Sequence, residues 1–422
     1  MSSPGPRPRS ELVVVVASAA TFGALLASQA ALRPVRDALV LDGDPDRIPW
    51  LFTATFVAML ALAPAWGRLV ARGARRVVPR AFHAFALCAI GFALAYRAEL
   101  SAPALVALGR VFYVWSAVFN LFVVSVFWSL LADLLGPSTA RRLYGPIAAG
   151  GTAGGILGPL ATKALVGAIG VGGVLAGSAL LLEAAALGVI AVRRAARALG
   201  DDTAAVAAAD PPIEGGAFDG LTHIARSPYL RAIVGYVLCT SCAATFVYFS
   251  KAHIAHDVLP DRTARTELFA SIDMWINAAV LAIQLFVASP LLGAVGPGLV
   301  LCVLPLVQGA AIAWLAAAPS LSALVAASIA GGAATHGLTR PARELLFTVL
   351  SRDDKYRAKN VIDTVAYRFG DTGSSWLDEG LRALGSSVLA FAALPLAAGW
   401  IALASFLGAE FRRRTTAKEP SS

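Results

Sequence analysis

No aspartate, glutamate, lysine or arginine occurs between Met274 and Thr339. A helix needs about 20 consecutive apolar residues to cross the roughly 30 Å hydrocarbon layer of a bilayer. Pro290, the Gly296-Pro297 pair and Pro319 divide this stretch into three segments of that size. The composition agrees, because 58% of all residues are apolar and only 14% are charged, against about 25% charged in soluble domains. We therefore expect a membrane protein.

Further apolar segments lie on both sides of this stretch. They cover residues 12–32, 48–67, 111–132, 143–162, 164–182, 232–250 and 384–409, with weaker segments at 80–97 and 358–382. A barrel strand would instead be about ten residues of alternating character. Together with the three segments above, this pattern predicts an all-α, polytopic membrane protein with twelve transmembrane helices.

The basic residues between these segments predict the orientation. Most Arg and Lys fall in alternate loops, on the side that also holds both termini. The positive-inside rule then places both termini in the cytoplasm, and we expect a multi-pass protein of the cell inner membrane. The first segment is longer than the core of a secretory signal, so we read it as an uncleaved helix. Basic loops facing anionic lipid account for the net charge of +9, and no nucleic-acid partner is expected.

The segment 193–226 is rich in Ala, Asp, Pro and Gly and predicts a cytoplasmic linker. It separates two six-helix bundles at 1–192 and 227–409, and a basic tail follows at 410–422. This layout, with "GRLVARGARRVVPR" after the second segment and with Gly145, Gly154 and Gly158-Pro159 in the fifth, resembles the major facilitator transporters. Close helix packing alone also explains each of these motifs.

Ionisable side chains at membrane depth are the candidate functional residues, because each costs about 2.5 kcal/mol or more unless it faces water or a partner. The candidates for substrate binding are Arg33, Arg36, Lys163, Lys359, Asp363, Tyr367, Arg368 and Asp371. Basic groups predominate, which predicts a small anionic substrate, since a guanidinium binds two phosphate or carboxylate oxygens at once. Asp363 and Asp371 would pair with these bases or carry a coupled proton. The alternative is that Asp363 and Arg368 form a purely structural pair.

The segment 358–382 is the most polar of the predicted helices. Lys359, Asp363, Tyr367 and Asp371 form one stripe at helical i, i+4 spacing, and Arg368 lies about 100° away. Such a helix cannot face lipid, so we expect it to line a central cavity.

Other chemistry has less support. Cys239 and Cys242 match CxxC but fall inside an apolar segment, which favours packing over redox chemistry. His253 and His256 have metal-ligand spacing without further clear ligands. No GxxxxGK[ST] motif and no nucleophile elbow is present in the sequence. We therefore do not expect an enzyme, and we expect no bound cofactor or metal. A monomer would suffice for function.

Four patches resemble the ATP/ADP translocase family of plastids and intracellular bacteria. They are "LRPVRDAL" at 32–39, "FYVW" at 112–115, "ARRLYGPIAAGG" at 140–151 and "KYRAKNVIDTVAYRFGDTGSS" at 355–375. The resemblance implies a nucleotide-exchanging relative of the major facilitators. The chain differs from the family at Ala117 and Thr245, where the family carries glutamates, and at Asp371, where it carries lysine. These differences imply another anionic or zwitterionic metabolite.

The sequence therefore predicts a secondary active transporter of an anionic metabolite, nucleotide or organic phosphate, that works by alternating access. The competing hypothesis is a membrane scaffold or sensor that keeps the fold without transporting.

Overall fold

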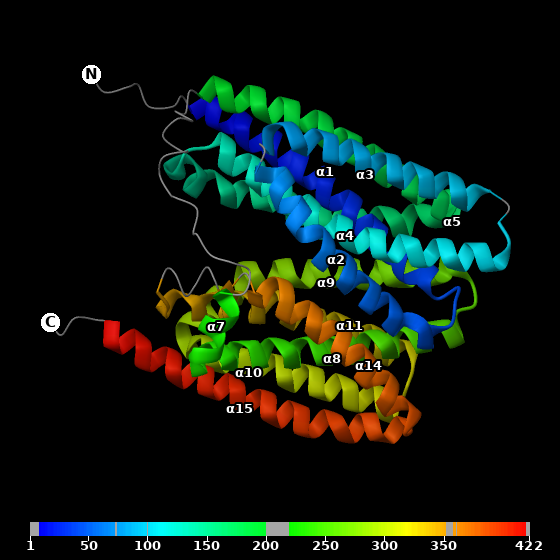
Figure 1. Ribbon diagram of the computed structural model, residues 1–422, viewed down its shortest axis with the longest axis vertical. Coiled ribbons are helices and arrows are strands. Elements are labelled where there is room, and N and C mark those ends of the chain that lie inside the picture. Colours follow the sequence, from blue (N-terminus) through cyan, green and yellow to red (C-terminus); the bar gives the residue numbers. More distant parts are fainter. Residues whose placement is uncertain are drawn as a thin grey trace. The chain divides into compact units, whose positions relative to one another are not determined.

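The computed structural model describes residues 8–71, 74–98, 100–199, 219–351, 358–359 and 361–418. Throughout this part of the chain the regular structure is helical and no strand occurs (Figure 1). The predicted all-α, polytopic fold class is confirmed. Lys355, Arg357, most of the predicted linker and the last residues of the tail lie outside the described residues.

The helices follow the chain in this order. The first half contains α1 (Pro8–Val40), η1 (Pro45–Arg47), α2 (Ile48–Ala71), α3 (Ala74–Arg97), α4 (Ala102–Leu134) and α5 (Pro137–Leu199). The second half contains α7 (Asp219–Arg226), α8 (Pro228–Val258), α9 (Arg262–Phe286), α10 (Ala288–Ala317), α11 (Leu321–Ala333), η2 (Ala334–Thr339), α12 (Arg340–Leu346), η3 (Phe347–Val349), η4 (Ile362–Ala366), α14 (Tyr367–Ala383) and α15 (Ser386–Lys418).

Within the described residues, eight helical spans are long and apolar enough to cross a membrane. One of these spans is α5 from Arg142 onward, which contains two helical segments joined at a kink. The predicted number of twelve transmembrane helices thus remains a prediction. The helices at both ends of the chain and the long apolar spans between them agree with a multi-pass membrane protein.

The kink in α5 lies at Gly170, whose φ is +67°. Lys163 separates the two charge-free segments 143–162 and 164–182 of the sequence, but the helix continues through it to Ile169. A lysine can stay in a helix interior, whereas a left-handed φ is accessible at low cost only to glycine. The contacts of α5 with α1 show that the chain reverses at this point. Before the kink the two helices run in the same direction, since Gly154 lies against Gly23 and Gly158 against Ala27. After the kink they run in opposite directions, since Ser178 bonds Ser28 and Gly188 lies against Thr21.

The chain forms two compact units. Unit 1 comprises residues 1–43, 57–212 and 259–274, and unit 2 comprises residues 44–56, 213–258 and 275–422. Each unit thus takes one short segment from the opposite half of the sequence. The predicted division into bundles at 1–192 and 227–409 was drawn from a linker and remains a prediction.

In unit 1, α1 packs directly on the backbone of α5. A Cβ added at Gly154 would lie 2.1 Å from the carbonyl oxygen of Gly23, and one at Gly158 would lie 2.4 Å from that of Ala27. Helices approach this closely only where small residues replace side chains. Gly154 and Gly158 of the predicted family motif therefore have a direct packing role, whereas nothing lies within 4 Å of a Cβ added at Gly145.

Unit 2 is held together by similar close approaches. Gly298 of α10 and Gly408 of α15 meet backbone to backbone. The hydroxyl of Tyr236 in α8 donates to the carbonyl oxygen of Leu301 at 2.8 Å. A Cβ at Gly370 of α14 would lie 2.9 Å from Cβ of Ser241, so α14 and its polar residues are pressed against α8.

Candidate functional site

In unit 1, Arg36 is held in place by a carboxylate and an aromatic ring. Its Nε and Nη2 both donate to Asp37 Oδ1, at 2.9 and 2.7 Å. Its guanidinium carbon lies 5.0 Å from the centroid of the Tyr113 ring on α4. Asp37 is almost fully buried and Arg36 is mostly buried. The single carboxylate oxygen accepts both bonds, which leaves the face of the guanidinium fixed against an aromatic ring.

Arg33 lies one turn earlier on α1 and pairs with Asp273 of α9, across 3.6 Å. The side chain of Arg33 is 39% exposed, so this pair is open to exchange with another anion. Asp273 belongs to the segment 259–274 that packs within unit 1. Arg33 and the Arg36–Asp37 pair therefore lie along one helix, α1, and Asp273 of α9 contacts the first of them.

Lys163 is the third basic candidate in this unit. It is exposed on α5, seven residues before the kink at Gly170. Among the described residues no ion pair includes it. The structure thus does not join Lys163 to the Arg33 and Arg36 pairs, and its role in substrate binding remains a prediction.

In unit 2, the most buried cation is Arg343 of α12, which is 6% exposed. Its Nη2 donates to Asp363 Oδ1 at 3.0 Å, and its guanidinium lies 5.2 Å from the centroid of the Tyr367 ring. Its Nε and Nη1 are buried and have no hydrogen-bond partner in the described residues. Buried polar atoms without partners are rare in native structures, which makes Arg343 a candidate for binding a ligand.

Arg343 is not among the candidates predicted from the sequence. It belongs to a basic cluster after Thr339 that counts toward the orientation of the chain, and of that cluster only Lys359 was a predicted binding residue. A signal was present, since Arg343 comes only one turn after this stretch ends and sits in the apolar context "RELLF". Positive-inside counting does not distinguish a buried arginine from one that faces water.

The predicted residues near Arg343 form the rest of this cluster. Lys359 pairs closely with Glu344, and its ammonium lies 5.7 Å from the centroid of the Phe347 ring. Asp363 and Tyr367 contact Arg343 as described above. Lys359, Asp363 and Tyr367, which share one predicted helix face, therefore lie in one cluster. Its central arginine, Arg343, could not be identified from their spacing.

Arg368 and Asp371 form a separate pair on α14. Their Nη1 and Oδ2 are 3.6 Å apart, and Asp371 also accepts a close hydrogen bond from Ser241 of α8. The alternative in which Asp363 and Arg368 form a structural pair does not hold, because Asp363 pairs with Arg343 and Arg368 with Asp371. Arg343 is a buried charge that needs a counter-charge, and Asp363 in the π-helix η4 supplies it. Arg368 and Asp371 are i, i+3 neighbours on one helix.

Both elements that carry the Arg343–Asp363 pair adjoin or form π-helices. The six-residue π-helix η2 runs directly into α12, and Asp363 lies inside η4. Short π-helices cost stability and are frequent at functional sites. Two of them on opposite sides of one ion pair single out this pair as the centre of the site in unit 2.

The cysteines are free thiols, and two histidines pair with aspartates. Cys239 and Cys242 are free thiols on α8. His253 pairs with Asp46 at 3.0 Å and His256 with its neighbour Asp257 at 3.3 Å. In the part of the chain that the structure describes, no three His, Cys, Asp or Glu side chains gather in a way that could hold a metal.

Comparison with known families gives one match over most of the chain. The family model of the Major Facilitator Superfamily matches residues 12–355. Two curated relatives are ADP,ATP carrier protein 1 of Chlamydia muridarum (strain MoPn / Nigg) and its counterpart in Chlamydia trachomatis serovar D, at 23% and 22% identity over 227 residues. Each match covers 48% of this chain and 43% of the relative. The chain thus matches less than half the length of these relatives.

Solved structures resemble the chain over nearly its whole length. A bacterial homologue of the iron transporter ferroportin, in an inward-facing state, has a TM-score of 0.63 at 12% identity and covers 94% of this chain and 99% of that one. A variant of the nucleoside transporter NupG has a TM-score of 0.57 at 13% identity, covering 96% and 99%. A bacterial homolog of the lysosomal transporter Spinster has a TM-score of 0.54 at 12% identity, covering 97% and 98%. At these identities the likeness establishes the fold.

Proposed function

The chain belongs to the major facilitator superfamily, and from this premise we propose that it is a secondary transporter that moves a small organic anion by alternating access. The family and the fold make it a multi-pass membrane transporter. The anionic nature of the substrate is our proposal, and a nucleotide or another organic phosphate is the class that fits best.

The proposal rests on the surroundings of one residue, Arg343. It is buried beside two π-helices, one of its nitrogens is bound to Asp363, and two others have no partner in the described residues. A guanidinium in that state can donate from Nε or Nη1 to a second oxyanion while Nη2 keeps its bond to Asp363. Tyr367, whose ring lies beneath the guanidinium, limits access to one side and gives an aromatic ring a surface on which to stack.

Unit 1 offers a matching arrangement in Arg36, Asp37 and Tyr113. Each unit therefore contains an arginine that is bound to a carboxylate and lies over a tyrosine ring. In alternating access, a substrate held by two bundles must be released when they separate. Asp37 and Asp363, which stay bound to the arginines when no substrate is present, would lower the cost of the empty state.

The curated relatives and three residues bear on which anion is transported. The relatives that match half of the chain are named as carriers of ADP and ATP. The two positions at which that family carries glutamates hold Ala117 and Thr245, both of which are buried. Asp371 is bound to Ser241 and Arg368 rather than free to repel or attract a phosphate. We therefore propose an organic phosphate or related anion other than the ATP/ADP pair.

The location follows from the same proposal. Arg and Lys residues concentrate in the loops on the side of the termini, and we propose an inner-membrane protein with cytoplasmic termini. Apart from lipid and substrate, the transport cycle needs no partner, so a monomer is proposed to be active.

The test is uptake into proteoliposomes that contain the purified protein. Labelled ADP, ATP, glycerol 3-phosphate and dicarboxylates are offered to vesicles with and without the same compound inside. We expect uptake of at least one phosphate compound, and Arg343→Gln and Arg36→Gln should each lower its rate about tenfold or more, as expected for loss of a charge-assisted contact.

Arg413→Gln is the matched control, because Arg413 is an exposed arginine on α15 that pairs only with Glu410 among the described residues. Its transport rate should be that of the unmodified protein. Equal rates for all three variants would contradict the proposed roles of Arg36 and Arg343. Absence of flux for every anion would instead favour the scaffold or sensor hypothesis.

A further inference from the structure

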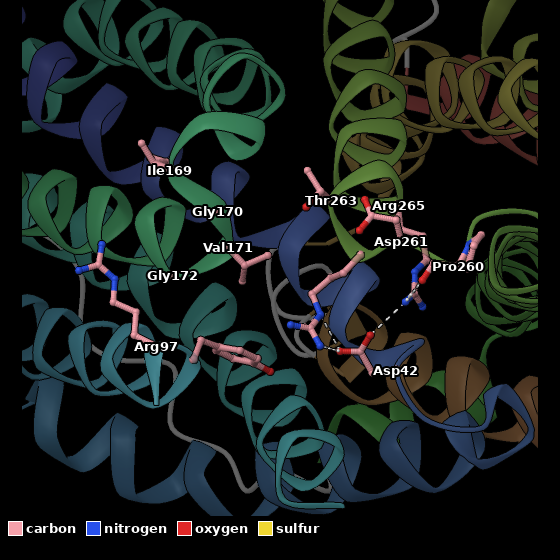
Figure 2. Close-up of a pocket in the computed structure, with 12 residues that line it drawn as sticks. Asp42, Arg97, Ile169, Gly170, Val171, Gly172, Pro260, Asp261, Thr263 and Arg265 are labelled. Atoms are coloured by element: carbon pink, nitrogen blue, oxygen red, sulfur yellow. Dashed lines mark hydrogen bonds and ion pairs between the residues drawn. The ribbon is translucent and has the colours of Figure 1, made fainter. Parts of the chain in front are cut away.

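A partly open cavity rich in arginine lies entirely within unit 1, and we call it the second cavity because it is separate from the transport residues. It has a volume of about 520 Å³ and is lined by residues at the ends of α1 and α3, at the kink of α5 and at the start of α9 (Figure 2). Sites for small organic molecules have volumes of about 300–1,000 Å³. None of the proposed transport residues is among those that line it. The cavity is thus a separate candidate site of suitable size.

The charged side chains that line the cavity carry a net positive charge. Its lining contains three arginines and two aspartates, namely Arg97, Arg262, Arg265, Asp42 and Asp261. Asp42 accepts from Arg262 at 2.8 Å and from Arg265 at 3.0 Å, and Figure 2 shows these interactions as dashed lines. One aspartate is therefore shared by two of the arginines. Among the described residues, no ion pair includes Arg97.

Two buried polar atoms at this cavity have no partner in the described residues. They are Nε of Arg265 and the hydroxyl oxygen of Tyr96. Arg265 is only 5% exposed, and its other nitrogens are fixed, with Nη1 donating to the carbonyl oxygen of Leu41 at 2.6 Å. An unmade bond at a buried donor costs about 1–3 kcal/mol. A ligand oxygen that accepts from both atoms would recover this energy.

The kink of α5 shapes the wall opposite to these atoms. A Cβ at Gly172 would lie 3.3 Å from Cγ of Arg97, so a side chain there would push on the arginine. Gly170 has φ of +67° and nothing within 4 Å of an added Cβ, which keeps this side of the cavity open. The wall is therefore mostly backbone, and Arg97 can lie along it.

We propose that this cavity binds a phosphate-bearing organic molecule at a site distinct from the transport residues. Arg97 and Arg265 Nε would donate to the phosphate oxygens, and the Tyr96 hydroxyl would add a third bond. Arg262 lies 5.8 Å from the centroid of the Tyr96 ring and limits the size of the attached group. The phosphate belongs either to a water-soluble ester or to the headgroup of a phospholipid, which share this chemistry.

The test measures binding to the full-length protein in phosphatidylcholine nanodiscs. Calorimetry with glycerol 3-phosphate is compared for the unmodified protein, Arg97→Gln and Tyr96→Phe. Both substitutions avoid the buried Asp42–Arg265 pair, so the fold should persist. Each should weaken binding about tenfold, the effect of losing one hydrogen bond to a charged group. Arg80→Gln, an exposed arginine at the other end of α3, is the matched control and should bind normally.

A second arm locates the ligand and identifies its source. Thr263 lines the cavity, and glycerol 3-phosphate should slow the reaction of Thr263→Cys with a charged thiol reagent, read at that peptide by mass spectrometry. Protection in pure phosphatidylcholine assigns the site to a soluble ester. A rise in melting temperature caused only by phosphatidylglycerol in the nanodisc, and abolished by Arg97→Gln, assigns it to lipid.

Two results would overturn the inference. One is that neither glycerol 3-phosphate nor phosphatidylglycerol affects the unmodified protein. The other is that binding survives in Arg97→Gln and Tyr96→Phe but is lost in Arg36→Gln or Arg343→Gln, which would place the ligand at the transport residues instead.

Discussion

Arg343 and Asp363 form an ion pair of 3.0 Å between α12 and the π-helix η4. The guanidinium is buried, whereas the carboxylate side chain is 36% exposed. Loss of the carboxylate therefore leaves a buried charge without its partner. We expect Asp363→Asn to destabilise the protein by about 2–3 kcal/mol, measured as a lower melting temperature in detergent.

A double-mutant cycle separates the pair from each residue alone. In the Arg343→Met background, Asp363→Asn should have a smaller effect than in the unmodified protein, because no buried charge remains to be neutralised. Additive effects of the two substitutions would contradict the ion pair. Arg413→Met, at an exposed position, is the control.

Gly154 sets the distance between α1 and α5. Because an added Cβ would lie 2.1 Å from the carbonyl oxygen of Gly23, Gly154→Ala must separate two backbones and should cost about 1–3 kcal/mol. Gly177→Ala is the matched control, since nothing lies within 4 Å of a Cβ at that helical position of the same α5, and it should be neutral or slightly stabilising. Both are compared by melting temperature; equal values would contradict the packing argument.

Gly170 tests the backbone rather than the packing. An added Cβ meets no atom within 4 Å, but φ is +67°, so Gly170→Ala should cost about 1–2 kcal/mol through backbone strain alone. Gly170→Asn should cost about as much, because ψ is 176° and this combination lies outside the left-handed α region that asparagine tolerates. If alanine is as stable as glycine here, the chain does not reverse at this residue.

Asp42 neutralises two arginines of the second cavity, and one of them, Arg265, is buried. Asp42→Asn should therefore lower stability by about 2–3 kcal/mol. Asp257→Asn removes a carboxylate that is 76% exposed and should change it by less than about 0.5 kcal/mol. Chemical denaturation in one detergent compares the two, and similar losses would exclude a special role for Asp42.

The fold class could be predicted from the sequence because a bilayer demands long apolar helices, and composition reports these directly. The polar character of the segment containing Asp363, Tyr367 and Asp371 also indicated the site in unit 2. These inferences depend on residue type and on spacing along one helix, both of which are visible in a single chain.

Ion pairs between residues on different helices could not be predicted from the sequence in this way. Arg368 was the partner of Asp363 in the structural alternative, whereas the carboxylate pairs with Arg343. Arg343 lies twenty residues from Asp363, on another element, and its burial depends on contacts that no local pattern contains. The same limit applies to the kink in α5, where one glycine among many takes the left-handed conformation.

The glycine contacts of α1 also determine which parts of unit 1 can change shape. Where two backbones touch without intervening side chains, there is no rotamer that can adjust to let one helix slide past the other. α1 and both segments of α5 should then move as a rigid block, and the proposed binding residues Arg33 and Arg36 would move with it. Flexibility for substrate release must come from elsewhere, and the two π-helical turns of unit 2 are the described elements best suited to supply it.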